Sequence, residues 1–179
     1  HEKFSYPEAL RFLAQKFNIT IVETESSEQD KQAAQEQESI YIVLNYAKKF
    51  FQEQLFDTEQ GKNIGLSYFK ERGFLESTIK SFDLGYAPDS YDAFYNQAIA
   101  NGHQKERLIN AGLIKEKNEK YYDFFRDRVM FPIHNVSGKV IAFGGRILKQ
   151  NEKAPKYINT PETEVYHKSH IVYGIYQAK

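Results

Sequence analysis

The chain has 179 residues, in which 24 Lys and Arg balance 24 Asp and Glu, and it contains 13 Tyr and 14 Phe but no cysteine. This composition is that of a soluble globular domain with a flanking segment rather than of a disordered chain. The lack of cysteine excludes a disulfide framework and a cysteine-ligated metal site, and no apolar run reaches the roughly 20 residues of a membrane span.

The charge is unevenly distributed along the chain. Residues 1–102 carry 10 basic and 16 acidic side chains, whereas residues 103–179 carry 14 basic and 8 acidic ones. A net charge of zero therefore does not exclude a nucleic-acid partner, because the second part of the chain is basic.

The first predicted element is a short helix that begins near Ser5. Ser5 and Glu8 have the spacing of a capping box, and the apolar residues that follow repeat at helical spacing, so the resulting face should pack on something. Residues 23–37 are polar without an apolar period, which favours a flexible linker. We therefore expect three segments: 1–22, a linker at 23–37, and the main domain at 38–179.

The middle of the chain is predicted to be helical. Apolar residues at i, i+3, i+4 and i+7 indicate a long helix, and shorter periodic stretches follow, each with a glycine near its end. The predicted helices are 36–56, 61–72, 78–82, 91–100 and 105–110, and the glycines that end the last four are Gly73, Gly85, Gly102 and Gly112.

The pattern changes to strands after Tyr121. Residues 129–134 and 140–143 alternate as a hairpin around a turn at 135–138, and Pro132, which has no N–H, should lie at an edge or a bulge. Further short strands are predicted at 156–158 and 170–173. Helices followed by strands indicate an α+β fold, with a helical N-terminal part and then a small, mainly antiparallel sheet with hairpins.

Motifs for catalysis are missing. The sequence has no nucleophile elbow, P-loop or zinc-hydrolase helix, and its carboxylates near the basic part, Asp123, Asp127, Glu162 and Glu164, do not form a convincing metal trio. We therefore predict no catalytic and no metal-binding residue in this chain, which resembles a binder more than a complete catalyst.

Several basic residues occur at the ends of predicted strands. Guanidinium groups on a rigid support suit phosphate, and the glycine pair before Arg146 would allow a ligand or another segment to approach closely. From the charge pattern alone, solvated surface cations or salt bridges explain the same residues slightly better. The nearby aromatic residues could stack on bases, but burial in the core also explains them.

Longer motifs carry a family resemblance. The run RDRVMFPIHNVSGKVIAFGGRIL (126–148), with PKYINTPET (155–163) and HKSHIVYGIYQAK (167–179), resembles the N-terminal subdomain of the RNA-polymerase core of bacterial DnaG-type DNA primases. YFKERGFLESTIKSFDLGYAP (68–88) resembles an earlier block of that family, and FSYPEALRFLAQKFNI (4–19) resembles the segment that follows its zinc domain.

The resemblance implies a set of binding residues for template DNA and nucleotide triphosphate. It assigns them as follows: Arg72, Arg126, Arg128, Arg146, Lys156, Asn159 and Lys168. Asn159 would orient Lys156 or bind a phosphate or sugar. Phe124 departs from the family, which often has a basic residue there, and Arg72 also suits the last turn of a helix whatever it binds.

The resemblance also implies what a parent protein would do. A DnaG-type primase makes short RNA primers on single-stranded DNA from ribonucleoside triphosphates, with zinc in an N-terminal domain and magnesium in a Toprim domain. Its expected partners are the template, the RNA primer, the replicative helicase and single-strand-binding protein, at a cytoplasmic bacterial replication fork. We expect this chain alone to lack cofactors, to be monomeric and to be inactive in nucleotidyl transfer. The alternative is a non-catalytic binding or scaffold module with the same fold.

Overall fold

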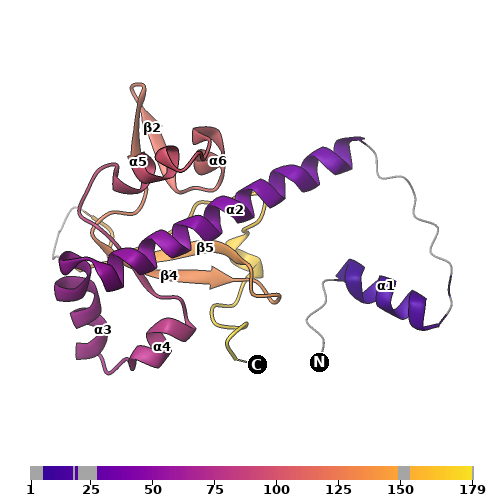
Figure 1. Ribbon diagram of the computed structural model, residues 1–179, viewed down its shortest axis with the longest axis horizontal. Helices are drawn as coiled ribbons and strands as arrows, with labels where there is room; N and C mark the ends of the chain where they lie inside the picture. Colours follow the sequence, from indigo (N-terminus) through magenta and orange to yellow (C-terminus); the bar gives the residue numbers. More distant parts are fainter. Residues whose placement is uncertain (1–5, 18, 20–27, 149–153, 179) are drawn as a thin grey trace.

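The computed structural model describes residues 6–17, 19, 28–148 and 154–178 (Figure 1). In these ranges helices come first and strands later, as the α+β prediction requires. The elements are α1 (Tyr6–Lys16), α2 (Glu28–Asp57), η1 (Gly61–Leu66), α3 (Ser67–Glu71), α4 (Glu76–Ser81), β1 (Gly85–Ala87), α5 (Ala93–Ala100), α6 (Lys105–Asn110), β2 (Ile114–Lys117), β3 (Lys120–Asp123), β4 (Arg128–His134), β5 (Val140–Ile147), β6 (Tyr157–Asn159) and η2 (Lys168–His170).

A four-stranded antiparallel sheet in the order β1-β4-β5-β6 forms the centre of the molecule. Directly opposed residues of antiparallel strands share a face, and successive residues alternate between the faces. One face carries Met130 and Phe143, which join the buried residues of α2 in the main core, and we call it the helix-covered face. Figure 1 shows α2 lying across β4 and β5.

The opposite face of the sheet, which we call the cavity face, carries a different set of side chains. The register of β4, β5 and β6 places them together: Val129, Phe131, Gly144, Arg146, Tyr157 and Asn159. Its margins are covered by α3, through an edge-to-face contact between Phe69 and Phe131, and by the C-terminal segment, through Tyr173 and Phe131. This face holds the candidate site.

Close packing fixes α2 on the sheet. The ring of Phe51 lies 5.3 Å from that of Phe143 and stacks at 5.9 Å on that of Phe94 in α5. Gly85 in β1 makes this approach possible, because a Cβ there would lie 2.6 Å from the Cβ of Phe51 and 2.9 Å from its carbonyl oxygen. Gly85 therefore belongs to a strand and permits packing, whereas the sequence predicted that it ends the preceding helix.

The predicted linker was wrong from Glu28 onward, because α2 begins there rather than near residue 36. Residues 28–38 are exposed, yet they are rich in Glu, Gln, Ala and Lys, which are good helix formers, and Lys31 pairs with Glu28 one turn away. An amphipathic helix that is already nucleated by its packed part extends at little cost through such residues. Residues 23–27 lie outside the described ranges, and the division of the chain into domains stays a prediction.

Most of the other predicted helices are confirmed. The stretch at 61–72 consists of the π-helical turn η1 followed by α3. The helices α5 and α6 end before Gly102 and Gly112. Gly73, Gly102 and Gly112 all have positive φ, as expected of glycines that end helices. Leu13 in α1 is about half exposed, and Phe17, which directly follows that helix, is more exposed, so the expected burial of the whole apolar face is not observed. Ser5, the predicted cap, lies outside the described residues.

The strand predictions were confirmed in the main hairpin and incomplete elsewhere. Pro132 lies on an interior strand, but β1 pairs only with residues 128–130, so the Pro132 end of β4 has β5 as its only described partner strand. The bulge lies one step on, at Ile133 and His134. The predicted strand at 170–173 was wrong, because η2 and turns occupy this segment. The β2–β3 hairpin and β1 were not predicted.

None of the described helices is long and apolar enough to cross a membrane.

Candidate nucleic-acid interface

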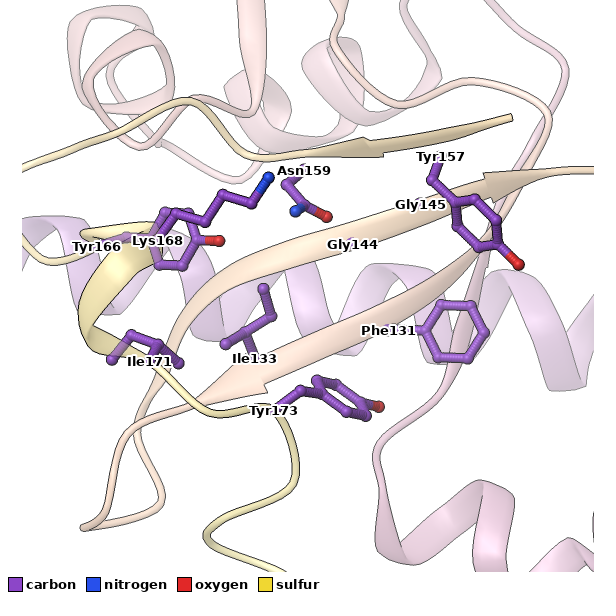
Figure 2. A pocket seen from close by; sticks show the side chains of 10 residues that line it. All are labelled: Phe131, Ile133, Gly144, Gly145, Tyr157, Asn159, Tyr166, Lys168, Ile171 and Tyr173. Atoms are coloured by element: carbon purple, nitrogen blue, oxygen red, sulfur yellow. The ribbon is translucent and has the colours of Figure 1, made fainter. Parts of the chain in front are cut away.

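A cavity of about 490 Å³ opens on the cavity face beside β5 and β6. Figure 2 shows its walls, which come from three strands and the C-terminal segment. The lining residues are Phe131, Ile133, Gly144, Gly145, Tyr157, Asn159, Tyr166, Lys168, Ile171 and Tyr173. Mainly apolar walls with a few polar groups are typical of a small-ligand or nucleobase pocket.

Two arginines near the cavity share one aromatic ring. The guanidinium carbon of Arg72 lies 3.8 Å from the ring centroid of Tyr68, and that of Arg146 lies 4.7 Å from the same centroid. Tyr68 is in α3 and Arg72 follows that helix directly, whereas Arg146 projects from β5. Residues 74 positions apart in sequence are thereby brought together by packing of α3 against the sheet margin.

A second tyrosine extends this group of cations. Arg146 and Lys156 each have their charged atom 5.9 Å from the ring centroid of Tyr157, which is 62% exposed. We call Tyr68, Arg72, Arg146, Lys156 and Tyr157 the cation–tyrosine cluster. Within the described part of the chain, none of its three cations forms an ion pair with a carboxylate.

Asn159 and Lys168 border the cavity itself, and in Figure 2 the Lys168 side chain extends toward Asn159. The space exists partly because residue 144 is glycine, since a Cβ there would lie 3.2 Å from the Asn159 side-chain oxygen. Among the described residues no hydrogen bond joins Asn159 to Lys156, and the orienting role of Asn159 stays a prediction. The Lys168 backbone N–H donates to Glu162, which fixes the start of η2.

Arg128 does not fit its predicted role as a phosphate contact. The residue is only 5% exposed, and its guanidinium donates to the carbonyl oxygens of Gly145, Pro155 and Lys156 at 3.1 to 3.4 Å. Burial lowers the pKa of Arg128, while the neighbouring Asp127 carboxylate opposes that shift. Arg128 therefore holds backbone segments together inside the protein.

Arg126 lies apart from the cation–tyrosine cluster. Its guanidinium stacks 4.0 Å from the ring centroid of Tyr91 and lies 3.8 Å from an Asp89 carboxylate oxygen. These residues border a second cavity of about 520 Å³, which Ile147 and Ile158 line from the helix-covered face. Of the seven predicted residues, the structure thus gathers five, Arg72, Arg146, Lys156, Asn159 and Lys168, around one surface.

Two details were missed or only half anticipated from sequence. Tyr68 was not predicted, although its spacing of four residues from Arg72 is that of neighbours on a helix and could have indicated the contact. At Phe124, where the family resemblance led us to expect a basic residue, the Lys115 ammonium from β2 lies 4.6 Å from the ring centroid.

The described residues contain no group of three His, Asp or Glu side chains that could hold a metal ion. The described part of the chain therefore does not fit a magnesium or zinc site. What the surface offers chemically is fixed positive charge, exposed tyrosine rings and a recess bordered by an amide and an ammonium group.

Comparisons with known proteins agree with one another. Residues 50–179 match the family described as "DNA primase catalytic core, N-terminal domain". A DNA primase of Halalkalibacterium halodurans is 37% identical over 99% of this chain, and one of Clostridium acetobutylicum is 38% identical over 97%. The chain spans only 29% and 28% of the length of these relatives.

Solved structures give the same result. A structure of the DnaG primase catalytic domain bound to single-stranded DNA matches 81% of this chain and 44% of its own, with a TM-score of 0.73 and 35% identity. A primase structure from Aquifex aeolicus that contains the zinc-binding and RNA polymerase domains matches 97% of this chain and 40% of its own, with a TM-score of 0.70 and 30% identity.

Proposed function

This chain belongs to the family of the N-terminal domain of the DNA primase catalytic core, and we propose from this premise that its cavity face holds template DNA and the incoming ribonucleoside triphosphate during primer synthesis. The observation that carries the proposal is the cation–tyrosine cluster at the rim of the cavity. A structural neighbour that is described as bound to single-stranded DNA supports the choice of ligand.

Each part of the surface would make a different contribution. Guanidinium groups such as those of Arg72 and Arg146 donate two parallel hydrogen bonds to a phosphate, and both are kept in position by the Tyr68 ring. The exposed ring of Tyr157 offers a face on which a base can stack, at about 1–3 kcal/mol per stacked base. Asn159 and Lys168 would bind polar groups that enter the cavity.

The contribution to the reaction would be electrostatic and positional. Phosphoryl transfer requires positive charge around the triphosphate and carboxylates that hold magnesium. The described residues supply the first requirement and show no acidic cluster for the second. We therefore propose that the parent primase supplies magnesium and its ligands from another domain, that its zinc lies in a further domain, and that this chain alone does not join nucleotides.

The remaining partners follow from the same premise. A primase that acts at a cytoplasmic replication fork meets the RNA primer on this surface, and the replicative helicase and single-strand-binding protein through its other domains. A non-catalytic module with the same surface would bind DNA equally well. Primer synthesis by the full-length parent distinguishes the primase from the non-catalytic module. If the surface serves catalysis, Arg146→Ala should abolish that synthesis.

Binding of a fluorescent single-stranded thymidine oligonucleotide, measured by anisotropy, tests the proposal on this chain. We expect weak binding that falls steeply between about 50 and about 200 mM salt, because each phosphate contact releases a counterion. Arg146→Ala should weaken it about fivefold and lower the salt slope by about one. Arg107→Ala is the matched control, because it removes an exposed arginine on α6 that does not belong to the cation–tyrosine cluster. Salt-independent binding, or equal losses in both variants, would contradict the proposal.

A further inference from the structure

Arg128 joins the two chain segments that carry Arg146 and Lys156. Its Nη1 donates to the carbonyl oxygen of Gly145, the residue before Arg146, at 3.3 Å. The same nitrogen and Nη2 each donate to the carbonyl oxygen of Pro155 at 3.1 Å, and Nη1 also reaches that of Lys156 at 3.4 Å. One side chain thus contacts the backbone of β5 and the backbone just before β6.

The surroundings of Arg128 are built to keep it there. Gly145 leaves room for it, because a Cβ at that position would lie 3.0 Å from Cδ of Arg128 and 2.8 Å from Cδ1 of Phe125. The Ile147 N–H donates to the Lys156 carbonyl at 3.0 Å. The guanidinium of Arg128 therefore binds the backbone directly beside the residues at which the pairing of β5 with β6 begins. The glycine pair before Arg146 therefore admits another segment of this chain on the Gly145 side.

The chemistry of the side chain explains why an arginine is buried at this point. A buried cation is costly unless its donors are satisfied, and here several are taken up by carbonyl oxygens. A planar fork can bond two segments at fixed separation, whereas a lysine ammonium on a flexible stem cannot reproduce that geometry. The residue is 5% exposed, which leaves little of it for a phosphate.

We propose that Arg128 is a positioning residue for DNA binding, which sets the place of Lys156 relative to Arg146 from beneath the sheet and does not contact nucleic acid. This inference rests on the proposed function, since it requires that Lys156 binds DNA. Arg146 and Lys156 point from the strand and from its neighbouring segment toward the exposed ring of Tyr157, and the Arg128 fork fixes the backbones behind both.

A double-mutant cycle on oligonucleotide binding tests the proposal. Arg128→Lys keeps the charge and loses the fork, and we expect it to weaken binding about fivefold in the parent chain and less than about twofold in a Lys156→Ala background. Equal losses in both backgrounds would show a general structural effect and overturn the proposal. Unchanged affinity in Arg128→Lys would show that only the charge matters and would overturn it as well.

The double-mutant cycle also distinguishes a failure of the positioning role of Arg128 from a failure of the proposed function. If Lys156→Ala alone leaves affinity unchanged, the proposed function fails at this residue. If Lys156→Ala weakens binding but does not couple to Arg128→Lys, only the positioning role fails.

A measurement without substitution covers the case in which Arg128→Lys does not fold. NMR signals of the guanidinium protons can be followed in the unsubstituted protein as the thymidine oligonucleotide is added. We expect the Arg146 signals to shift and those of Arg128 to stay in place. Shifts of equal size at Arg128 and Arg146 would identify Arg128 as a phosphate contact and overturn the proposal.

Discussion

The two faces of the central sheet are made by the same strands and carry different sets of side chains. The helix-covered face packs Met130 and Phe143 against α2, and both residues are fully buried. The cavity face carries Arg146, Tyr157 and Asn159 around a recess, although each of these residues is a direct neighbour of one on the other face. Because side chains alternate between the faces, neighbouring residues of one strand have these different surroundings, although Val129 and Ala142 on the cavity face are buried as well.

The two faces give an arginine different surroundings. The alternation of side chains along β4 places Arg128 on the helix-covered face, where its guanidinium is buried and donates hydrogen bonds to carbonyl oxygens. Arg146 has its position on the cavity face, and there the guanidinium lies among tyrosine rings. The two arginines differ in burial and in contacts because they lie on opposite faces of the sheet.

The largest effect should come from the helix-covered face. Phe51→Ala removes a ring that contacts those of Phe50, Phe94, Phe125 and Phe143, and we expect it to lower the free energy of unfolding by about 3–5 kcal/mol. Urea denaturation followed by circular dichroism measures the loss. Tyr157→Ala, on the cavity face, is the matched aromatic control and should change stability by less than about 0.5 kcal/mol. Equal losses in the two variants would remove the distinction between the faces.

A second effect concerns a buried carboxylate at the end of β3. Asp123 accepts hydrogen bonds from the N–H groups of Phe94 and Tyr95, both at 2.9 Å, and so caps the start of α5. Burial raises the pKa of Asp123 to about 6 from its ordinary value of 3.8, despite these two bonds. Between these values the folded state holds a proton that the unfolded state has lost, so stability should fall as the pH rises from about 4 to about 6.

Asp123→Asn should remove this fall, which amounts to up to about 3 kcal/mol. Urea unfolding of both proteins at several values between pH 4 and pH 7 measures the difference. Asp83→Asn is the control, since burial of Asp83 is outweighed by the His134 hydrogen bond and the Lys48 charge, which hold its pKa below the ordinary value. Its contribution is lost only as the pH falls below about 4. Parallel curves for Asp123→Asn and the parent would contradict the assignment.

The sequence was informative where local patterns decide structure and uninformative where distant contacts do. Apolar periodicity located α2 and the β4–β5 hairpin, because a buried face requires that spacing. It did not locate β1, whose three residues are held by pairing with β4 and by the fit of Gly85 against Phe51. A segment this short has no measurable period of its own.

The candidate site shows the same division between local and distant information. The motifs were sufficient to select Arg146, Lys156 and Lys168, which lie at the cavity face. They could not separate Arg128 from these residues, because burial depends on the carbonyl groups of residues 145 and 155, which come together only after folding. Tyr68 was missed for the same reason, since its contact with Arg146 depends on the packing of α3.

The smallest effect is expected at Arg126, the predicted binding residue that lies with the helix-covered side. Its guanidinium is engaged by the Tyr91 ring and faces the Asp89 carboxylate, and it borders a cavity separate from the one beside Asn159. A carboxylate next to the cation offsets the charge that a phosphate would meet, so Arg126→Ala should change oligonucleotide affinity by less than about twofold and leave the salt slope unaltered. Anisotropy titrations at two salt concentrations, run beside Arg146→Ala, make the comparison. A loss at Arg126 as large as that at Arg146 would mean that DNA contacts both sides of the sheet edge, and the face of the sheet would then not determine which cations bind.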